Sequence, residues 1–124
     1  MEQKFYVCSH CGNIIAKVKD AGVPVMCCGQ KMTEIVPNTT DAAQEKHVPK
    51  YEQKGNLVIV DIGSIAHPML DNHYIEWVSI QTNLGNQRKC LKPNDLPHVE
   101  FALLDGEKVE AVYAYCNLHG LWKA

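Results

Sequence analysis

The sequence contains no apolar run that approaches the roughly 20 residues a membrane-spanning helix needs. Its charges are almost balanced, with 12 basic and 14 acidic side chains and a net charge of −2. The strongly basic surface typical of nucleic-acid-binding proteins is therefore missing. Residues 1–5 lack the basic and then apolar pattern of an export signal. These absences predict a cytoplasmic protein that binds neither nucleic acid nor membrane.

The chain does have enough apolar sequence for a folded protein, and a clustered set of thiols. Of its 124 residues 46% are hydrophobic, which fits one ordinary domain, or a very small domain followed by a modest one. It has six cysteines. In the reducing compartment that we expect, clustered thiols favour metal binding over disulfide bonds. The adjacent pair Cys27-Cys28 is also poorly placed to form a bridge with itself.

Four cysteines near the start of the chain predict one metal site. Cys8 and Cys11 have C-x-x-C spacing, which places two sulfurs on one side of a loop, and Cys27 with Cys28 would complete a tetrahedron. Four thiolates suit either zinc or a single iron, and ligand type alone does not choose between them. A site with four protein ligands leaves no position for substrate. Its role is therefore structural or electron-transferring.

Residue patterns divide the chain into three parts: a metal domain of residues 1–36, a connector of residues 37–50 and a β-rich domain of residues 51–124. The first part is too short to bury much surface, so a metal or a partner subunit is needed to stabilise it. In the connector, Asp41 and Gln44 have the spacing of a helix start, which predicts at most one short helical turn.

Runs rich in β-branched and aromatic residues predict the strands of the third part, at 57–62, 74–80, 99–104 and 109–115. Turn signals separate these runs, which is the pattern of a β-sandwich. The pair Asp105-Gly106 between the last two runs predicts a two-residue hairpin.

A second metal site is indicated by ligands that lie far apart in the sequence. Cys116 and His119 form a C-x-x-H pair at the end of an expected strand, and His67 and His73 lie on one expected loop. His47 is contributed by the connector. Each of these residues alone has an ordinary explanation as a surface or core side chain. Their combination, at places where the loops of a sandwich gather, indicates a site.

Three further residues of ligand type are left out of both sites. His10 is expected to be exposed between two cysteines. His98 has no partner at ligand spacing and is expected to face solvent, and Cys90 is interpreted as a structural thiol.

These motifs, in this order and spacing, resemble those of desulfoferrodoxin, the two-iron class of superoxide reductase. They are C-x-x-C, Cys-Cys, Glu-Lys-His-Val-Pro, Ala-His-Pro-Met with a further His, and Cys-Asn-Leu-His-Gly-Leu-Trp-Lys. The resemblance covers nearly the whole chain. It implies an all-β fold, in which a small desulforedoxin-like N-terminal metal domain is followed by an immunoglobulin-like β-sandwich, and it implies a homodimer.

The resemblance also implies two non-haem irons per chain. One would be held by four thiolates, those of Cys8, Cys11, Cys27 and Cys28. The other would have four equatorial imidazoles and an axial thiolate, those of His47, His67, His73, His119 and Cys116. Such a square pyramid has one vacant position and a net positive charge, which favours a small anion such as superoxide.

Roles for two charged residues follow from the same resemblance. Lys46 would attract superoxide or order proton-donating water. Glu45 would take the sixth position once the iron is ferric. Without the resemblance, these residues would be interpreted as a solvated charge pair in a connector.

Three residues near the axial cysteine are candidates for tuning it. The backbone amides of Asn117 and Leu118 would donate hydrogen bonds to the Cys116 sulfur. Ala114 departs from the family pattern, since relatives often carry Glu two residues before this cysteine. The loss of that acid would change hydrogen bonding and charge near the sulfur.

The sequence therefore predicts an enzyme, a superoxide reductase that makes hydrogen peroxide without dismutation to oxygen. The four-thiolate iron would be an electron relay or an accessory, and a rubredoxin-like protein or a reductase would donate electrons. The alternative is a non-enzymatic two-iron electron-transfer protein. Glu45 and Lys46 beside an open position argue against it, because pure carriers close their sites. A third interpretation is a β-sandwich interaction module stabilised by zinc.

Overall fold

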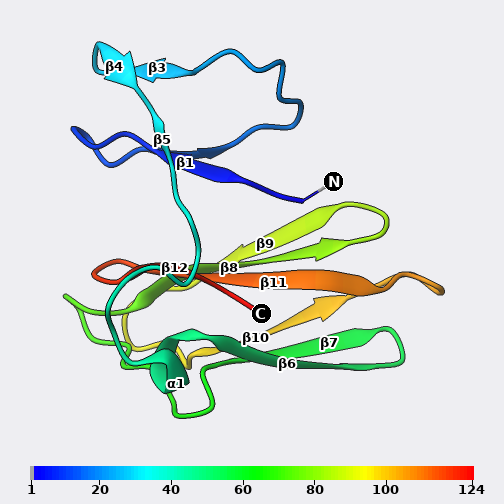
Figure 1. Ribbon diagram of the computed structural model, residues 1–124. Coiled ribbons are helices and arrows are strands. Elements are labelled where there is room, and N and C mark those ends of the chain that lie inside the picture. Colours follow the sequence, from blue (N-terminus) through cyan, green and yellow to red (C-terminus); the bar gives the residue numbers. More distant parts are fainter. Residues whose placement is uncertain (1) are drawn as a thin grey trace. The chain divides into compact units, whose positions relative to one another are not determined.

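The computed structural model describes residues 2–124, which are almost entirely β-structure (Figure 1). The chain divides into a first unit that ends at Val36 and a second unit that spans Pro37–Ala124. Each unit has its own sheets. The predicted all-β class is confirmed. Within the described residues, no helix has the length and apolar character needed to cross a bilayer.

The first unit contains two small sheets. β1 (Phe5–Val7) lies between β2 (Ile14–Ala16) and β5 (Thr33–Glu34) and pairs antiparallel with both. β3 (Met26–Cys27) and β4 (Gln30–Lys31) form a separate antiparallel pair.

The apolar core of the first unit is small. Phe5, Cys8 and Met32 are buried, whereas Val18 and Val23 are exposed. So few buried side chains cannot offset the conformational entropy of ordering the segment, in agreement with the need for a metal or a partner.

Two antiparallel sheets pack face to face in the second unit (Figure 1). Their strand orders are β10-β7-β6 and β12-β11-β8-β9. In chain order the strands are β6 (Pro49–Lys54), β7 (Leu57–Ile62), β8 (Ile75–Thr82), β9 (Asn86–Cys90), β10 (His98–Ala102), β11 (Val109–Cys116) and β12 (Gly120–Lys123). β6 begins inside the segment that the sequence assigned to the connector.

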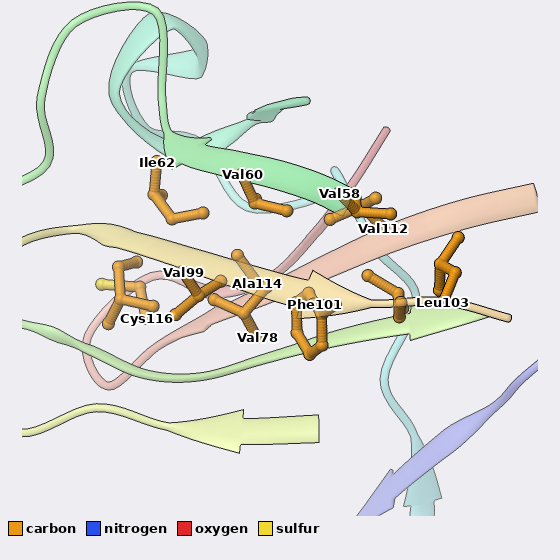
Figure 2. Close-up of a cluster of buried hydrophobic side chains, with 12 residues drawn as sticks. Val58, Val60, Ile62, Val78, Val99, Phe101, Leu103, Val112, Ala114 and Cys116 are labelled. Atoms are coloured by element: carbon orange, nitrogen blue, oxygen red, sulfur yellow. The ribbon is translucent and has the colours of Figure 1, made fainter. Parts of the chain in front are cut away.

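Alternation along the strands builds the core between the two sheets (Figure 2). In β7, Val58 and Val60 are fully buried, while Asp61 points away to solvent. Phe101 of β10 and Val112 of β11 meet them in the same buried cluster. Each fully buried apolar side chain of this size contributes about 1.5–3 kcal/mol.

The predicted hairpin at Asp105-Gly106 is wrong, although a tight turn is present. Gly106 has a φ of +82°, which glycine adopts without strain. The strands on either side do not pair, because β10 pairs with β7 while β11 pairs with β8 and β12. Phe101 and Val112 bury their side chains from opposite sheets, so the turn carries the chain across the core.

The connector contains one helical turn, as predicted, but this turn does not begin at Asp41 as the sequence indicated. α1 (Gln44–His47) is preceded by Ala43, and no side chain caps its first turn. The Asp41 carboxylate therefore does not begin the helix. The Val48 N–H donates to the Gln44 carbonyl oxygen at 2.9 Å, and the chain then enters β6.

Candidate metal centres

Four thiols converge in the first unit, and we call them the four-cysteine site. Their sulfurs lie within 4.8 Å of one another, and they belong to Cys8, Cys11, Cys27 and Cys28. Cys8 is buried, whereas Cys11 and Cys28 are exposed. Gly12, with a φ of +84°, turns the first of the two loops back after its cysteines.

Hydrogen bonds to these sulfurs favour thiolates. The Cys11 N–H donates to Cys8 Sγ and the Asn13 N–H to Cys11 Sγ, each at 3.5 Å. The Asn13 side-chain amide donates to Cys27 Sγ at 3.7 Å. Backbone hydrogen bonding from Cys11, only partly offset by burial, lowers the pKa of Cys8 to about 6.

The four thiols cannot all ionise unaided. Hydrogen bonding with the neighbouring thiols, first Cys11 and then Cys8, raises the pKa of Cys28 to about 12. Negative charges this close repel each other, so a cation is needed to deprotonate the whole set. The donor set therefore fits a tetrahedral metal ion such as iron or zinc.

Four imidazole rings in the second unit form a near-square. The centroids of neighbouring rings are 4.7 Å apart for His47 and His67, 4.8 Å for His67 and His73, 5.1 Å for His73 and His119, and 5.0 Å for His119 and His47. The diagonal from His47 to His73 is 6.4 Å. Neighbouring rings are turned by 74° to 88°. These four rings and the thiol of Cys116 are called the histidine–cysteine site.

The ring nitrogens have the spacing of ligands around one ion. His47 Nε2 lies 3.2 Å from His67 Nε2 and 3.2 Å from His119 Nδ1. Metal–nitrogen bonds of about 2.1 Å at right angles place neighbouring nitrogens about 3 Å apart.

Backbone carbonyls fix which nitrogen of each buried ring carries hydrogen. His47 Nδ1 donates to the Ala43 carbonyl oxygen at 2.7 Å, and His67 Nδ1 donates to the Pro68 carbonyl oxygen at 2.6 Å. The Nε2 lone pairs of both neutral rings therefore face inward, where they cannot bond to each other. His73 Nε2 is buried and has no hydrogen-bond partner among the described residues. An ion between these lone pairs would satisfy all three, so the site fits a metal.

Three of the rings, those of His47, His67 and His73, are favoured in the neutral form that ligands need. Burial, followed by weaker repulsion from the neighbouring rings, lowers the pKa of His67 to about 4. Burial also lowers the pKa values of His47 and His73, and the Lys46 charge adds to both shifts. Lys46 directly precedes the ligand His47 in the sequence. Lys46 and Glu45 are both exposed.

Cys116 lies at one end of the buried cluster (Figure 2). Its sulfur is within 4.8 Å of the donor nitrogens of His47, His67 and His73, and 3.9 Å from His119 Nδ1. Cys116 is fully buried, whereas His73 and His119 are partly exposed. Solvent therefore reaches part of the His73 and His119 residues but not the sulfur.

Two backbone amides point at this sulfur, but only one of them was predicted. Burial raises the pKa of Cys116, and hydrogen bonds from the Leu118 and His119 amides oppose that rise. The Asn117 amide instead donates to the Tyr74 carbonyl oxygen at 3.2 Å, so the prediction for Asn117 is wrong.

Asn117 has a different part in the site. Its side-chain oxygen accepts from the Tyr74 N–H at 2.9 Å, and its side-chain nitrogen donates to the Asn72 carbonyl oxygen at 3.0 Å. These bonds fasten both neighbours of His73. Asn117 therefore orients a ligand loop rather than the sulfur.

Trp122 is a site residue to which the sequence assigned no role. It is fully buried, and its ring stacks on His47 with centroids 4.8 Å apart. Its indole N–H donates to the His119 carbonyl oxygen at 3.1 Å. Trp122 thus orients two neighbouring ligands. The sequence signal that could have identified Trp122 is its position in the same short motif as Cys116 and His119.

Ala114 lies on the same face of β11 as Cys116. It is fully buried in the core cluster and pairs with Trp122 of β12 and Val78 of β8 in the strand register. The position therefore connects the axial cysteine to the sandwich core.

The residues left out of both sites lie elsewhere. Cys90 is exposed on β9, so its interpretation as a structural thiol is wrong. His10 is exposed, as expected. His98 is only partly exposed, and its ring bonds Asp61 at 2.7 Å and Glu100 at 2.9 Å.

The fold and the two donor sets define a class of non-haem metalloprotein, in which a small four-thiolate unit precedes an immunoglobulin-like sandwich with an imidazole square and an axial thiol. The desulfoferrodoxin family model matches residues 39–124. The chain belongs to the desulfoferrodoxin family, and its two donor groups correspond to the two iron sites of that family.

Relatives agree over almost the whole chain. A desulfoferrodoxin homolog of Archaeoglobus fulgidus is 46% identical over 119 residues, covering 96% of this chain and 94% of the relative. The desulfoferrodoxin of Nitratidesulfovibrio vulgaris is 42% identical over 125 residues, covering 99% and 96%. The crystal structure of the superoxide reductase from Treponema pallidum superposes with a TM-score of 0.84 at 38% identity, covering 100% of this chain and 99% of that one. The family membership that the sequence motifs indicated is confirmed.

Proposed function

We propose that the protein is a superoxide reductase, which combines superoxide with one electron and two protons to give hydrogen peroxide. The observation that carries this proposal is the near-square of four imidazole rings beside the buried thiol of Cys116, in which His73 and His119 are partly exposed. The superoxide reductases among the similar proteins support it.

Iron held by these five residues would supply the reducing electron. Four neutral rings and one thiolate leave a divalent ion with one uncompensated positive charge, which favours an anionic substrate. The hydrogen bonds from the Leu118 and His119 amides moderate electron donation by the Cys116 sulfur.

Lys46 and Glu45 are proposed to serve the entrance. The Lys46 ammonium attracts superoxide, and water ordered beside it donates protons. The Glu45 carboxylate competes with small anions for the oxidised centre.

The four-cysteine site is proposed to hold the second iron, as an electron relay or an accessory. Its electrons would come from a rubredoxin-like protein or a reductase. We further propose a homodimer and a cytoplasmic location. The exposed thiols of Cys11, Cys28 and Cys90 are best preserved in a reducing compartment, which supports this location.

The second candidate function is a non-enzymatic electron carrier with two irons. The four-cysteine site favours it, because four protein ligands leave no room for substrate. The exposed charged pair Glu45 and Lys46, which directly precedes the ligand His47, argues against it, because a pure carrier needs no residues that attract an anion.

Rapid mixing of the reduced, iron-loaded protein with superoxide distinguishes the two functions. A reductase should release one hydrogen peroxide for each superoxide consumed and no oxygen. The metal-free protein and His98→Ala, which removes a histidine outside the site, are the controls. A rate no faster than spontaneous dismutation would rule out the reductase.

A further inference from the structure

The helical turn that carries Glu45 and Lys46 has little stability of its own. α1 spans only Gln44–His47 and lacks a side-chain cap. The Val48 N–H to Gln44 carbonyl bond of 2.9 Å closes it. A single turn is not stable in water by itself, so contacts from elsewhere decide where its side chains lie.

The turn formed by residues 63–65 supplies such contacts. The Ile65 N–H donates to the Glu45 carbonyl oxygen at 2.9 Å, and the Ser64 hydroxyl donates to the same oxygen at 3.2 Å. Both lone pairs of that carbonyl are therefore used. The Gly63 N–H donates to the Ile65 carbonyl oxygen at 3.2 Å, which closes the turn on itself.

Gly63 allows the turn to approach the backbone of α1 closely. A Cβ added to it would lie 2.7 Å from the Glu45 carbonyl oxygen, 2.9 Å from the Val48 carbonyl oxygen and 3.1 Å from the Lys46 carbonyl carbon. These contacts are to backbone atoms, which cannot swing aside as a flexible side chain can. Any residue larger than glycine would therefore push the two segments apart.

The ligand His47 is held by other contacts. Its Nδ1 bonds the Ala43 carbonyl oxygen, and its ring stacks on Trp122. The 63–65 turn is connected to the second ligand, His67, whose N–H donates to the Ile62 carbonyl oxygen at 2.7 Å. The 63–65 turn thus contacts the backbone of α1 at Glu45 and Lys46, whereas the rings of His47 and His67 are oriented by other contacts.

We propose that the 63–65 turn is a latch that positions Glu45 and Lys46 at the entrance of the histidine–cysteine site. Its effect on catalysis rests on the proposed function. With the latch closed, the Lys46 ammonium is confined near the rings and raises the local concentration of incoming anions. With the latch loosened, the Lys46 side chain samples more conformations, so its ammonium attracts incoming anions less.

The first test compares Ser64→Ala, which removes one donor, and Gly63→Ala, which adds the clash, in the iron-loaded protein. The second-order rate with superoxide at low salt should fall about threefold and about tenfold, respectively, and the curves should converge with wild type at high salt. Metal content and the thiolate-to-iron absorption should not change. A matched control is Gln87→Ala, which removes a side-chain hydrogen bond to the Ala102 carbonyl oxygen between strands that carry no ligand.

A double-mutant cycle separates the latch from a general structural role. In a Lys46→Ile background, Ser64→Ala should have no further effect on the rate, because the charge that it positions is gone. An equal loss of rate in both backgrounds would show that the turn acts through His67, and would overturn the proposal.

Hydrogen exchange tests the latch without activity. In the metal-loaded protein, Ser64→Ala should speed exchange of the Ile65 and Val48 amides while the amides of β8 stay protected. Unchanged exchange at both amides would overturn the latch. If the wild-type protein fails to reduce superoxide, the proposed function fails, and this measurement still decides the latch.

Discussion

Within the histidine–cysteine site, the orientation of each ring is set by a partner outside the ligand set. Ala43 and Pro68 offer carbonyl oxygens to His47 and His67, and Trp122 offers a stacking surface. These partners therefore hold the ring nitrogens pointing inward, toward one another. Such outer partners are worth about 10- to 100-fold in metal affinity in other sites.

Replacing Trp122 tests this arrangement. Trp122→Phe keeps a ring to stack on His47 but loses the hydrogen bond to the His119 carbonyl. We expect about a tenfold loss of affinity for cobalt(II), measured by competition with a chelator. Trp77→Phe is the matched control, because Trp77 stacks on Tyr115, which is not a ligand. Equal affinities for Trp122→Phe and wild type would contradict this role.

Lys46 is expected to act through its charge. Lys46→Ile should slow capture of superoxide by about tenfold at low ionic strength and flatten its dependence on salt. Stopped-flow rates at several ionic strengths measure both. Lys54→Ile removes an exposed lysine at the far end of β6 and should leave the slope close to wild type. Identical slopes for Lys46→Ile and wild type would remove the steering role.

His98 predicts a pH dependence of stability. Hydrogen bonds with Asp61 and then Glu100 raise the pKa of His98, so the stabilisation is full below the unfolded pKa and is lost as pH rises through the folded one. His98→Gln should therefore cost more at pH 6 than at pH 8. The difference should be below about 1 kcal/mol, because the pair is partly exposed.

Denaturant unfolding at the two pH values measures this difference. The control is His10→Gln, which changes an exposed histidine in the first unit. A cost for His98→Gln that is independent of pH would contradict the prediction.

At the scale of elements, the sequence predicted the apolar strands, including the edge strand β10, and missed the edge strands β6, β9 and β12. β7, β8 and β11 are rich in β-branched or aromatic residues, and each was found. β6 and β9 are edge strands with the sequences PKYEQK and NQRKC, whose polar composition resembles that of a loop. Pairing with a neighbour makes them strands, and a single sequence does not display that pairing.

In the histidine–cysteine site, the ligands could be predicted from the sequence, but the residues that orient them could not. The ligands have distinctive residue types and spacing, so the resemblance could identify all of them. The contacts of Trp122, Asn117 and the 63–65 turn depend on how strands and loops meet in space. The hairpin error at Asp105-Gly106 has the same origin, since turn residues fix a change of direction but not which strands then pair.

For the whole molecule, the two units differ in what stabilises them. The second unit has a continuous core shared by two sheets, while the first has few buried side chains around its thiols. Removing the metal of the four-cysteine site should therefore unfold the first unit and leave the second folded.

Cys11→Ser tests this difference, because Cys11 is exposed and its loss does not disturb a core. We expect the metal content to fall from two ions per chain to one, with the histidine–cysteine absorption retained and the superoxide rate within about twofold of wild type. Cys90→Ser, at an exposed cysteine outside both sites, is the control. Loss of both metals from Cys11→Ser would show that the units do not fold separately.

The inward-facing lone pairs of the imidazole square have a consequence for the living cell. Copper and zinc bind nitrogen and sulfur donors more tightly than ferrous iron does. The donor types of this pocket do not by themselves favour iron, so its iron content depends on the geometry of the site and on which metal the cell supplies.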